Sequence, residues 1–271
     1  MISVVIAARD EERRIGGCLS SVAGWADEVV VVDDHSTDRT AAVAEEAGAR
    51  VIRLAEQPFD ADEARGRPDL VFKVGFLAAD GDWILRMDCD ERPSDGLKAR
   101  LSEVAVGEGY AAVRFARRYY YFGDWLRHGG WFRSEQLGFF RADAWDRTWP
   151  TAIHQHVPVS GRVLALPAVE ELSMAHLEYD DVTQFVTRAL LSYARADGRG
   201  RVRDARPEWR PSLFVRPMRR SMGRYVIRGG FRDGTRGAVA AALLGAYEVC
   251  AEAFAWEAAR ADRQRDAIAS E

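Results

Sequence analysis

The sequence has few cysteines and no long apolar run. Its three cysteines, Cys18, Cys89 and Cys250, lie far apart without a CxxC spacing, which argues against a disulfide framework and fits a reducing compartment. No run of about 20 uncharged apolar residues occurs, so no membrane-spanning helix is expected. The opening MISVVIAARDEE lacks a basic n-region, so no signal peptide is expected either. These absences predict a cytoplasmic protein.

Composition otherwise suits a soluble globular protein. The chain has 271 residues, 48% of them hydrophobic and 30% charged, which fits one large domain or one domain with an appendage. A net charge of −4 argues against a nucleic-acid partner. Lysine is nearly absent, because Lys73 and Lys98 are the only two. Arginines instead crowd one segment that holds a single acid, Asp233: they are Arg210, Arg216, Arg219, Arg220, Arg224, Arg228, Arg232 and Arg236.

The first hundred residues alternate between strand and helix patterns. Four short apolar runs predict strands, at Ile2 to Ala8, Glu28 to Val32, Arg50 to Leu54 and Trp83 to Met87. Helical stretches separate them, and the last of these runs from Leu70 to Ala79. Repeated strand–helix–strand units of this length predict an α/β fold with a parallel sheet and right-handed crossovers.

Acidic residues follow three of these predicted strands. In open α/β sheets, ligands bind beyond the carboxyl ends of the strands. We therefore expect the acids to share one binding edge; they are Asp10, Glu11, Asp33, Asp34, Asp88 and Asp90.

The segment GDWILRMDCDERP carries the most specific of these acids. Asp88 and Asp90 point to the same side of a strand end, because strand side chains alternate with period two. Two converging carboxylates repel each other unless a cation lies between them, and Mg²⁺ or Mn²⁺ shared with phosphate oxygens is the natural choice. A solvated turn with helix-capping acids is the alternative.

Two other kinds of site are disfavoured by position. Haloacid-dehalogenase-type phosphatases carry a similar pair of aspartates on the first strand, whereas here it follows the fourth. A nicotinamide-binding fold would need G-x-G-x-x-G after the first strand, where this chain has AARDEE.

The order and spacing of these motifs resemble a known family. The segments "SVVIAARDEERRIGGCLSSVAGWADEVVVVDDHSTDRTAAVAEEAGARV" and "GDWILRMDCDERPS" resemble family 2 inverting glycosyltransferases of the GT-A fold. Further segments, "GDWLRHGGWF" and "RYVIRGGFRDGTRGAVAAALLGAYE", are most similar to the subgroup of lipopolysaccharide-core β-1,4-glucosyltransferases.

The resemblance implies a domain plan. Residues 1–175 would form the GT-A catalytic domain, with 1–107 binding the nucleotide-sugar and 108–175 facing the acceptor. Residues 176–271 would form a C-terminal helical extension.

The resemblance also implies roles for single residues. Ala8, Arg9 and Glu11 would line the nucleotide, with Asp10 where the family commonly has Asn. Asp33 would accept a hydrogen bond from the base, and Asp34 could share that role. Asp88 would face the ribose or the metal, and Asp90 would be the principal ligand of a divalent Mg or Mn ion.

Three further segments depart from the family pattern. Phe72-Lys73 stands where an Arg-Asn pair is frequent, and Lys73 could still meet a phosphate. Gly138 replaces an Arg in GFFRA, and Gln155 replaces a Glu in IHQHV.

The catalytic base is left open by these departures, because Gln cannot accept the proton of an acceptor hydroxyl. Glu135, Asp143, His154 and His156 are candidates, and Glu135 or His154 is favoured. His154 could instead complete the metal shell.

The arginine-rich tail predicts a further partner. Its apolar residues alternate with arginines, from Leu213 to Phe231, as in helices that lie on an anionic membrane surface. The alternative is ordinary packing onto the rest of the protein. Peripheral attachment to the inner face of the cell membrane would suit a lipid-linked acceptor.

The resemblance therefore implies a metal-dependent transfer of a hexose. The donor would be a nucleotide-diphosphate sugar, UDP-linked by preference, and the acceptor a saccharide or a lipid-linked molecule. Two alternatives stay open: a polyprenyl-phosphate sugar transferase, whose acceptor needs no strong base, and an inactive sugar-nucleotide-binding protein.

Overall fold

A computed structural model describes residues 1–56, 68–107, 109–133, 135–148, 157–201 and 212–269. The chain divides into two compact units. Unit 1 comprises Met1–Arg118 and Arg133–His176, and unit 2 comprises Tyr119–Phe132 and Leu177–Glu271. Compactness therefore assigns residues 119–132 to the second unit as well, whereas the sequence alone predicts a single boundary after residue 175.

The first half of unit 1 is a parallel sheet. Its strands are β1 (Ile2–Ala8), β2 (Glu28–Asp33), β3 (Arg50–Arg53) and β4 (Trp83–Asp88), in the order β3-β2-β1-β4. Every neighbouring pair is parallel. The helices α1 (Glu12–Val22), α2 (Thr40–Glu46) and α4 (Pro68–Ala78) make the crossovers. The predicted parallel α/β arrangement is confirmed here.

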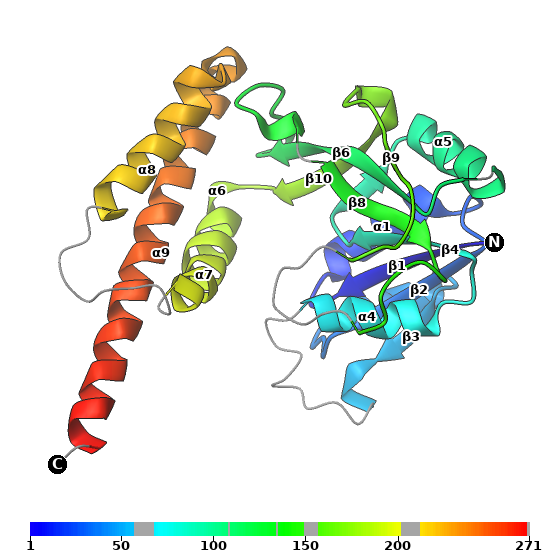
Figure 1. Cartoon of the computed structure of the whole chain (residues 1–271), viewed down its shortest axis with the longest axis horizontal. Coiled ribbons are helices and arrows are strands. Elements are labelled where there is room, and N and C mark those ends of the chain that lie inside the picture. The colour runs from blue at the N-terminus through cyan, green and yellow to red at the C-terminus, as the bar shows by residue number, and fades with distance from the viewer. Residues whose placement is uncertain (57–67, 108, 134, 149–156, 202–211, 270–271) are drawn as a thin grey trace. The chain divides into compact units, whose positions relative to one another are not determined.

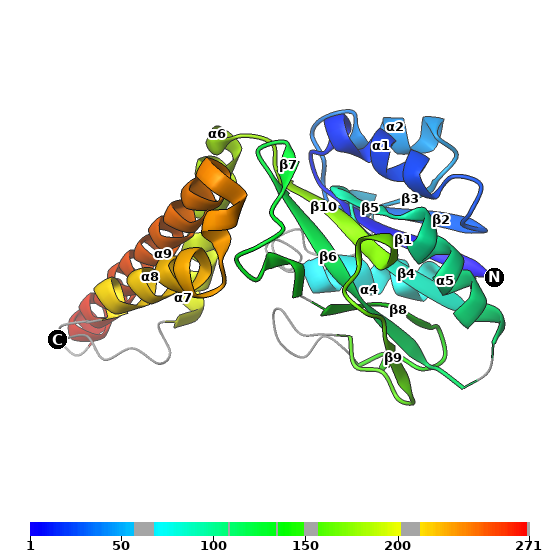
Figure 2. The same ribbon diagram turned by 90° about the horizontal axis from the view of Figure 1, so that it is seen from above.

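The second half of unit 1 extends the same sheet with antiparallel pairs. The sheet continues from β4 through β8, β6 and β10 to β5 (Figures 1 and 2). The bounds are β5 (Glu91–Pro93), β6 (Ala112–Tyr121), β8 (Glu135–Arg141), β9 (Val163–Ala165) and β10 (Ser173–Tyr179). Short 3-10 turns η1 (Leu54–Glu56), η2 (Trp131–Arg133) and η3 (Glu170–Leu172) join elements. The sheet as a whole is mixed.

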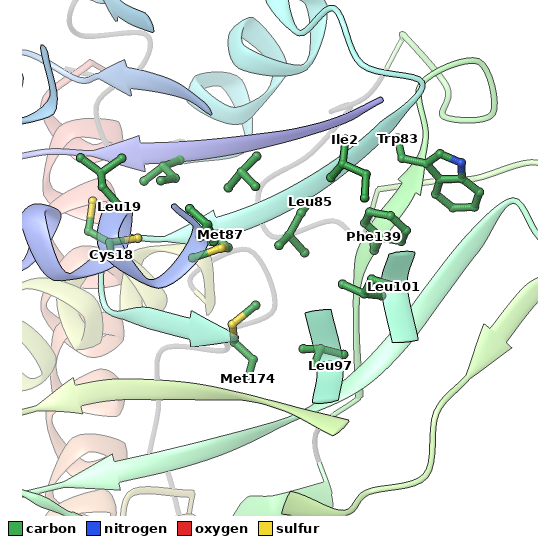
Figure 3. Close-up of a cluster of buried hydrophobic side chains, with 14 of the residues drawn as sticks. Ile2, Cys18, Leu19, Trp83, Leu85, Met87, Leu97, Leu101, Phe139 and Met174 are labelled. Carbon is green, nitrogen blue, oxygen red and sulfur yellow. The ribbon is translucent and has the colours of Figure 1, made fainter. Parts of the chain in front are cut away.

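The apolar core of unit 1 has two layers, one on each face of the sheet. Alternate residues of β1 explain this: Ile2, Val4 and Ile6 face α1, α2 and α5 (Asp95–Val106), whereas Val5 faces α4. Figure 3 shows the first layer, where Cys18 and Leu19 of α1 lie beside Met87 of β4. Figure 2 shows α1 and α2 on one side of the parallel strands and α4 on the other.

Sequence patterns predict most of these boundaries closely. The strand from Ile2 to Ala8 occurs with the predicted bounds. The sequence after Pro93 also predicts a helix near Asp95 to Val106, and α5 has these bounds. Ser94 caps α5 by accepting a hydrogen bond from the Leu97 amide at 3.2 Å. The sequence pattern from His176 to Asp197 predicts a helix, and this is wrong for its first residues. Strand β10 runs to Tyr179, and the helix begins at Val182 after the cap at Asp181.

Gly138 occupies a bulge that explains its departure from the family pattern. The pairing of β6 with β8 shifts between Val113 and Arg114, which leaves Gly138 as the extra residue. A Cβ at this position would lie 2.6 Å from the ring Cζ of Phe115. No side chain fits there without moving a buried aromatic ring, so an arginine is excluded on steric grounds.

Unit 2 is mainly helical. It contains β7 (Asp124–Trp125), α6 (Val182–Gln184), the π-helix η4 (Phe185–Tyr193), α7 (Ala194–Arg201), α8 (Ser212–Met222), the π-helix η6 (Gly223–Ile227), η7 (Gly230–Asp233) and α9 (Gly234–Ala269). Both α7 and α8 pack along α9 (Figures 1 and 2). An aromatic cluster with Tyr121, Trp131, Tyr179 and Phe185 forms its core.

One helix of unit 2 is long and apolar enough to cross a membrane by length and composition. The segment is Gly230–Arg265, with a mean hydropathy of 1.5 in its best window, of which 44% is buried within the protein. The core helix of a soluble protein passes the same test. The sequence alone predicted no spanning helix, because Glu248 and Glu252 interrupt the run.

Candidate active site

The carboxyl ends of three parallel strands meet at one edge of the unit 1 sheet. In the strand register, Ala8 of β1 lies opposite Asp33 of β2, and Ala7 lies opposite Asp88 of β4. Strand alignment therefore brings together the acids that follow these strands. The predicted common edge is confirmed by this register.

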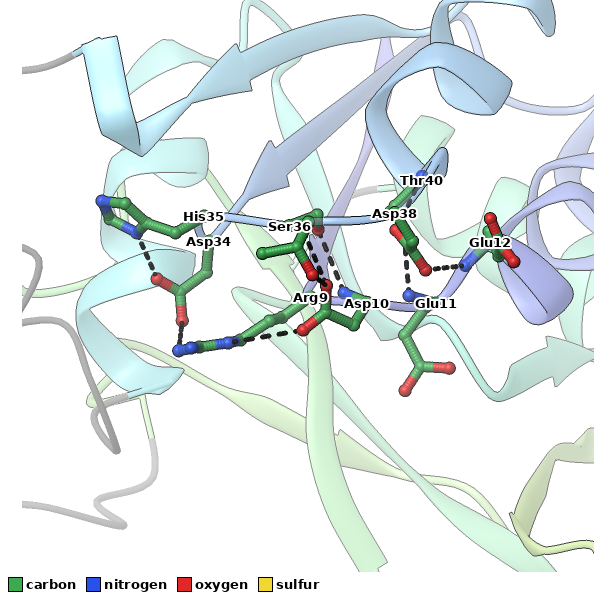
Figure 4. Close-up of polar contacts among 10 residues, drawn as sticks. Arg9, Asp10, Glu11, Glu12, Asp34, His35, Ser36, Asp38 and Thr40 are labelled. Carbon is green, nitrogen blue, oxygen red and sulfur yellow. Dashed lines mark hydrogen bonds and ion pairs between the residues drawn. The ribbon is translucent and has the colours of Figure 1, made fainter.

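Asp10 joins the loop after β1 to the loop after β2. Its Oδ1 accepts hydrogen bonds from the Thr37 amide at 2.7 Å and the Thr37 hydroxyl at 3.1 Å, and its own amide donates to Ser36 Oγ at 3.0 Å (Figure 4). Asp10 has a φ of 52°, in the left-handed region. Asp10, which stands where the family commonly has Asn, thus links the two loops by hydrogen bonds.

The residues after Asp10 add further hydrogen bonds between the same two loops through their backbone amides. The Glu11 amide donates to Thr40 Oγ1 at 2.7 Å, and the Glu12 amide donates to Asp38 Oδ2 at 3.1 Å. Asp38 Oδ1 also accepts from the Thr40 amide at 2.9 Å. The Glu11 carboxylate points away from these contacts in Figure 4. The loop is therefore held through its backbone amides, and the Glu11 carboxylate takes no part in these hydrogen bonds.

Arg9 and Asp34 form the outer part of the same edge. Arg9 Nη1 lies 3.5 Å from Asp34 Oδ2, and Asp34 Oδ1 lies 2.9 Å from His35 Nδ1 (Figure 4). Both oxygens of Asp34 therefore already contact protein groups. The structure places Arg9 beside Asp34, a contact that the sequence did not predict.

Asp33 differs from its neighbour. It is 5% exposed, and its Oδ1 is buried without a hydrogen-bond partner among the described residues. A buried carboxylate oxygen without a partner costs free energy, and such groups are uncommon unless a ligand completes them. Of the two adjacent acids, Asp33 is the one that retains an acceptor for a ligand.

Asp88 is held in place by a buried pair beside it. Its amide donates to Glu91 Oε2 at 2.9 Å, and Arg117 of β6 lies 3.3 Å from Asp88 Oδ2 and 2.5 Å from Glu91 Oε1. Glu91 is 1% exposed, and burial raises the pKa of its carboxyl group against the opposing charge of Arg117. The Asp88 side chain itself is more than a third exposed. The buried pair of Glu91 and Arg117, called the clamp below, thus holds the accessible carboxylate of Asp88 in place.

Asp90 lies between two cationic or potentially cationic groups. Arg14 Nη1 of α1 is 3.5 Å from its Oδ2, and His176 Nε2 of β10 is 3.3 Å from its Oδ1. Burial opposes ionisation, but His176 and Arg14 outweigh it and hold the pKa of Asp90 below its usual value. Asp90 is therefore a charged and nearly buried carboxylate.

The two cysteines near this edge are part of the core. Cys18 Sγ lies 3.6 Å from the Asp88 carbonyl oxygen, and Cys89 Sγ lies 3.3 Å from the Ala7 carbonyl oxygen. Burial raises the pKa of Cys18 to about 12 and raises that of Cys89 well above its usual value. Both are neutral thiols, which argues against their acting as metal ligands.

The donor set at this edge was tested for a divalent cation. Among the described residues, no three His, Cys, Asp or Glu side chains converge as a metal cluster. Asp90 and His176 nonetheless face each other, and the accessible carboxylate of Asp88 is two residues away. Mg²⁺ and Mn²⁺ sites that share a nucleotide diphosphate need only one or two protein carboxylates, because phosphate oxygens and water complete the shell. The residues present fit such an ion.

Three further predicted site residues are Lys73, Glu135 and His154. Lys73 is half-buried on α4, and its charge lowers the pKa of Asp146, after the larger contributions from Thr148. Glu135 begins β8, and its backbone pairs with Ala116 of β6. His154 lies outside the described residues, as do Gln155 and His156.

Several residues of the edge were missed by sequence reasoning. They are Arg14, Glu91, Arg117 and His176. Glu91 was visible in the acidic segment but was given no role. Arg14, Arg117 and His176 reach the site from three different elements, so only tertiary structure joins them to Asp88 and Asp90. The sequence offered one signal, His176, because the chain has only five histidines.

A family model matches over half of the chain. Residues 3–160 match the model described as "Glycosyl transferase family 2". This range includes the strand-end acids and β8.

Curated relatives match over shorter segments. A TPR repeat-containing protein of Synechococcus elongatus is 39% identical over 90 residues, which is 33% of this chain and 20% of that protein. An uncharacterized glycosyltransferase of Rickettsia felis is 34% identical over 103 residues, or 38% of this chain and 33% of that protein. The matched part of the chain thus spans between a fifth and a third of these relatives.

Solved structures give a likeness of limited extent. Glucosyl-3-phosphoglycerate synthase from Mycobacterium tuberculosis, in complex with Mn²⁺, uridine diphosphate and glucosyl-3-phosphoglycerate, has 30% identity and a TM-score of 0.35. The match covers 44% of each chain.

Proposed function

The chain belongs to glycosyltransferase family 2 and has the α/β GT-A fold, and on this premise we propose that it transfers a hexose from a nucleotide-diphosphate sugar to an acceptor with inversion. The single observation that carries the proposal is the buried Asp33 Oδ1, which lacks a partner among the described residues at the edge where β1, β2 and β4 end. An N–H of a nucleobase would supply the missing hydrogen bond.

Asp33 is the base-recognising residue in this proposal. Uracil presents an N3–H donor, so a carboxylate acceptor favours a UDP-linked donor. Asp34 is engaged by Arg9 and His35, which assigns it to holding the loop. Ala8, Arg9 and Glu11 would line the same nucleotide, since Ala8 ends β1 opposite Asp33 and the other two follow it.

Asp90 and Asp88 would hold the divalent cation, and phosphate oxygens and water would complete its shell. His176 lies 3.3 Å from Asp90 Oδ1 and would orient that carboxylate. When bound, the ion would neutralise charge on the leaving diphosphate. The clamp of Glu91 and Arg117 keeps the Asp88 carboxylate in position, because it fixes the Asp88 amide. Arg14 and Arg117 add positive charge close to where the diphosphate would lie. These side chains bind and orient the donor.

The acceptor hydroxyl must lose its proton during an inverting transfer. Glu135 and His154 remain our candidates for the group that takes it. Glu135 stands at the start of β8, which pairs with both β4 and β6. This pairing supports Glu135, because β8 is the neighbour of β4, the strand that ends at Asp88.

The acceptor we propose is a saccharide or a lipid-linked molecule of cell-envelope or glycan biosynthesis. This finer assignment rests on the resemblance to lipopolysaccharide-core β-1,4-glucosyltransferases. An acceptor on a lipid would require the protein to work at the inner face of the cell membrane.

Calorimetric titration tests the donor part of the proposal. UDP, GDP, dTDP and CMP forms of sugars are titrated into the protein with Mn²⁺ and again with EDTA. We expect metal-dependent binding of one diphosphate sugar, the UDP form. No binding of any of them in Mn²⁺ would overturn the proposal.

A transfer assay with the bound donor separates the alternatives. Transfer to a saccharide acceptor supports the proposal as stated, and transfer only to a polyprenyl phosphate would identify the other transferase. Binding without transfer to any acceptor and without hydrolysis would identify an inactive sugar-nucleotide-binding protein.

A further inference from the structure

One face of α8 and η6 is apolar and exposed. Ile227 is 83% exposed and Phe214 is 67% exposed. Residues four apart on a helix share a face, and the exposed apolar residues of this segment follow that spacing: Phe214, Val215, Met218, Met222, Val226 and Ile227. Single exposed apolar residues are ordinary, but a continuous row of them indicates a binding surface.

The opposite face of α8 carries arginines that pair inward. Arg216 Nη1 lies 2.6 Å from Glu252 Oε1 of α9, and Arg220 pairs with Glu248. Glu252 and Glu248 are 2% and 4% exposed. The side chains of Arg216 and Arg220 are 51% and 40% exposed, and their guanidinium groups turn toward the buried acids of α9. The helix thus directs two of its charges toward the neighbouring helix and its apolar side outward, whereas a surface helix of a water-soluble protein turns its apolar side inward.

The guanidinium group of Arg224 also contacts other residues of unit 2. This group lies 3.9 Å from the centre of the Trp131 ring and donates to the Gly129 carbonyl oxygen at 3.2 Å. These arginines hold unit 2 together. The sequence pattern suggested that they would meet lipid headgroups, and the contacts correct this for Arg216, Arg220 and Arg224.

The charge around the apolar face selects its partner. No acidic residue occurs from Ser212 to Arg232. Arg219, Arg228 and Arg232 are exposed along this segment, and no described residue forms an ion pair with them. A row of apolar side chains bordered by cations alone matches the boundary between anionic headgroups and acyl chains.

We propose that the exposed apolar face of α8 and η6 inserts into the headgroup–acyl boundary of an anionic membrane. This attachment does not depend on the transferase activity. The apolar side chains supply the binding energy, while Arg219, Arg228 and Arg232 meet the headgroups. The buried pairs with Glu248 and Glu252 keep the remaining arginines out of the lipid.

Vesicle flotation of the full chain tests this surface. Vesicles of phosphatidylcholine with phosphatidylglycerol are compared with phosphatidylcholine alone. The test variant carries Met218→Glu, Met222→Glu and Ile227→Glu, which change only exposed positions. We expect it to lose roughly a hundredfold in partitioning to anionic vesicles, since three apolar contacts are replaced by charges.

The matched control places glutamate at exposed apolar positions of unit 1. Leu77→Glu and Val106→Glu change residues that are 53% and 88% exposed. The control should float like the wild type, and donor binding should be unchanged in all variants. Failure of the wild type to float, or equal flotation of the test variant, would overturn the proposal. Light scattering without vesicles supplies the remaining outcome: a wild-type dimer that the test variant abolishes would make this face a protein interface instead and would also overturn it.

Discussion

The two units differ in where they expose large apolar side chains and in how their buried acids are paired. In unit 1, the parallel strands bury apolar side chains in two layers and carry their acids at the strand ends. In unit 2, Glu248 and Glu252 are buried between helices, while apolar side chains face outward. Among the described residues, the large exposed apolar side chains of unit 1 are Met1, Leu77, Val106 and Val169, and all the others belong to unit 2.

The buried acids of the two units differ in whether other protein groups pair with their carboxylate oxygens. Glu252 contacts both Arg201 and Arg216, at 2.9 and 2.6 Å, so its charge is matched within the protein. Asp33 retains an oxygen without a partner among the described residues. A matched buried pair serves packing, whereas an unmatched carboxylate at a strand end is available to a ligand. The predictions below test this difference from the largest expected effect to the smallest.

Asp90→Asn should have the largest effect, and it acts on binding. We expect metal-dependent donor affinity to fall by at least about a hundredfold, because a neutral amide is a poor ligand for a hard cation. Titration with Mn²⁺ at a temperature where both proteins are folded measures this. Asp80→Asn changes an exposed acid and should bind like the wild type. Unchanged metal-dependent affinity in Asp90→Asn would remove the metal role from this residue.

Glu252→Ala should have a large effect on stability and none on donor binding. The change leaves Arg201 and Arg216 without their shared partner in a partly buried site, and we expect a loss of roughly 2 to 3 kcal/mol in the free energy of unfolding. Urea denaturation measures it. The control Glu257→Ala changes an exposed residue on the same helix. Equal stability of the two variants would show that the buried pair is dispensable.

The sequence predicts where helices and strands lie along the chain better than it predicts the contacts between them. Apolar runs and turn residues located β1 and α5 within their observed bounds, because period and capping are local properties. The common edge of the strand-end acids followed from parallel topology alone. Arg14, Arg117 and His176 could not be assigned, since each reaches Asp88 or Asp90 from an element distant in sequence.

The orientation of α8 illustrates the same limit of pattern reading. An amphipathic pattern tells which residues share a face, but not which face is turned inward. The pattern alone suggested arginines facing a membrane. Only the positions of Glu248 and Glu252 on α9 reveal that Arg216 and Arg220 point inward.

Gly198→Ala should destabilise unit 2 through close helix packing. A Cβ there would lie 2.6 Å from the Ala251 carbonyl oxygen and 2.7 Å from Phe254 Cβ, both on α9. We expect a cost of about 2 kcal/mol, as for other overpacked sites. Thermal unfolding measures it. Gly200→Ala is a matched control two residues along α7, where a Cβ meets nothing within 4 Å. The control should be neutral or stabilising by up to about 1 kcal/mol, and a similar loss in both would refute the packing explanation.

Arg219→Glu should have the smallest effect, restricted to anionic vesicles. Reversing one charge near a lipid surface should weaken partitioning by roughly tenfold, since each basic residue contributes about 1 kcal/mol. Partitioning to phosphatidylcholine alone and the unfolding temperature should not change, because Arg219 forms no ion pair with a described residue. A drop in unfolding temperature would place Arg219 with the inward arginines.

The most direct measurement is a paired titration and unfolding experiment on Asp33→Ala. If the unmatched carboxylate serves the donor, the variant should lose UDP-sugar binding in Mn²⁺. Its free energy of unfolding should meanwhile stay equal or rise by up to about 1 to 2 kcal/mol, because a buried group without a partner has been removed. Intact donor binding together with a loss of stability would contradict the account, since Asp33 would then be a structural residue like Glu252.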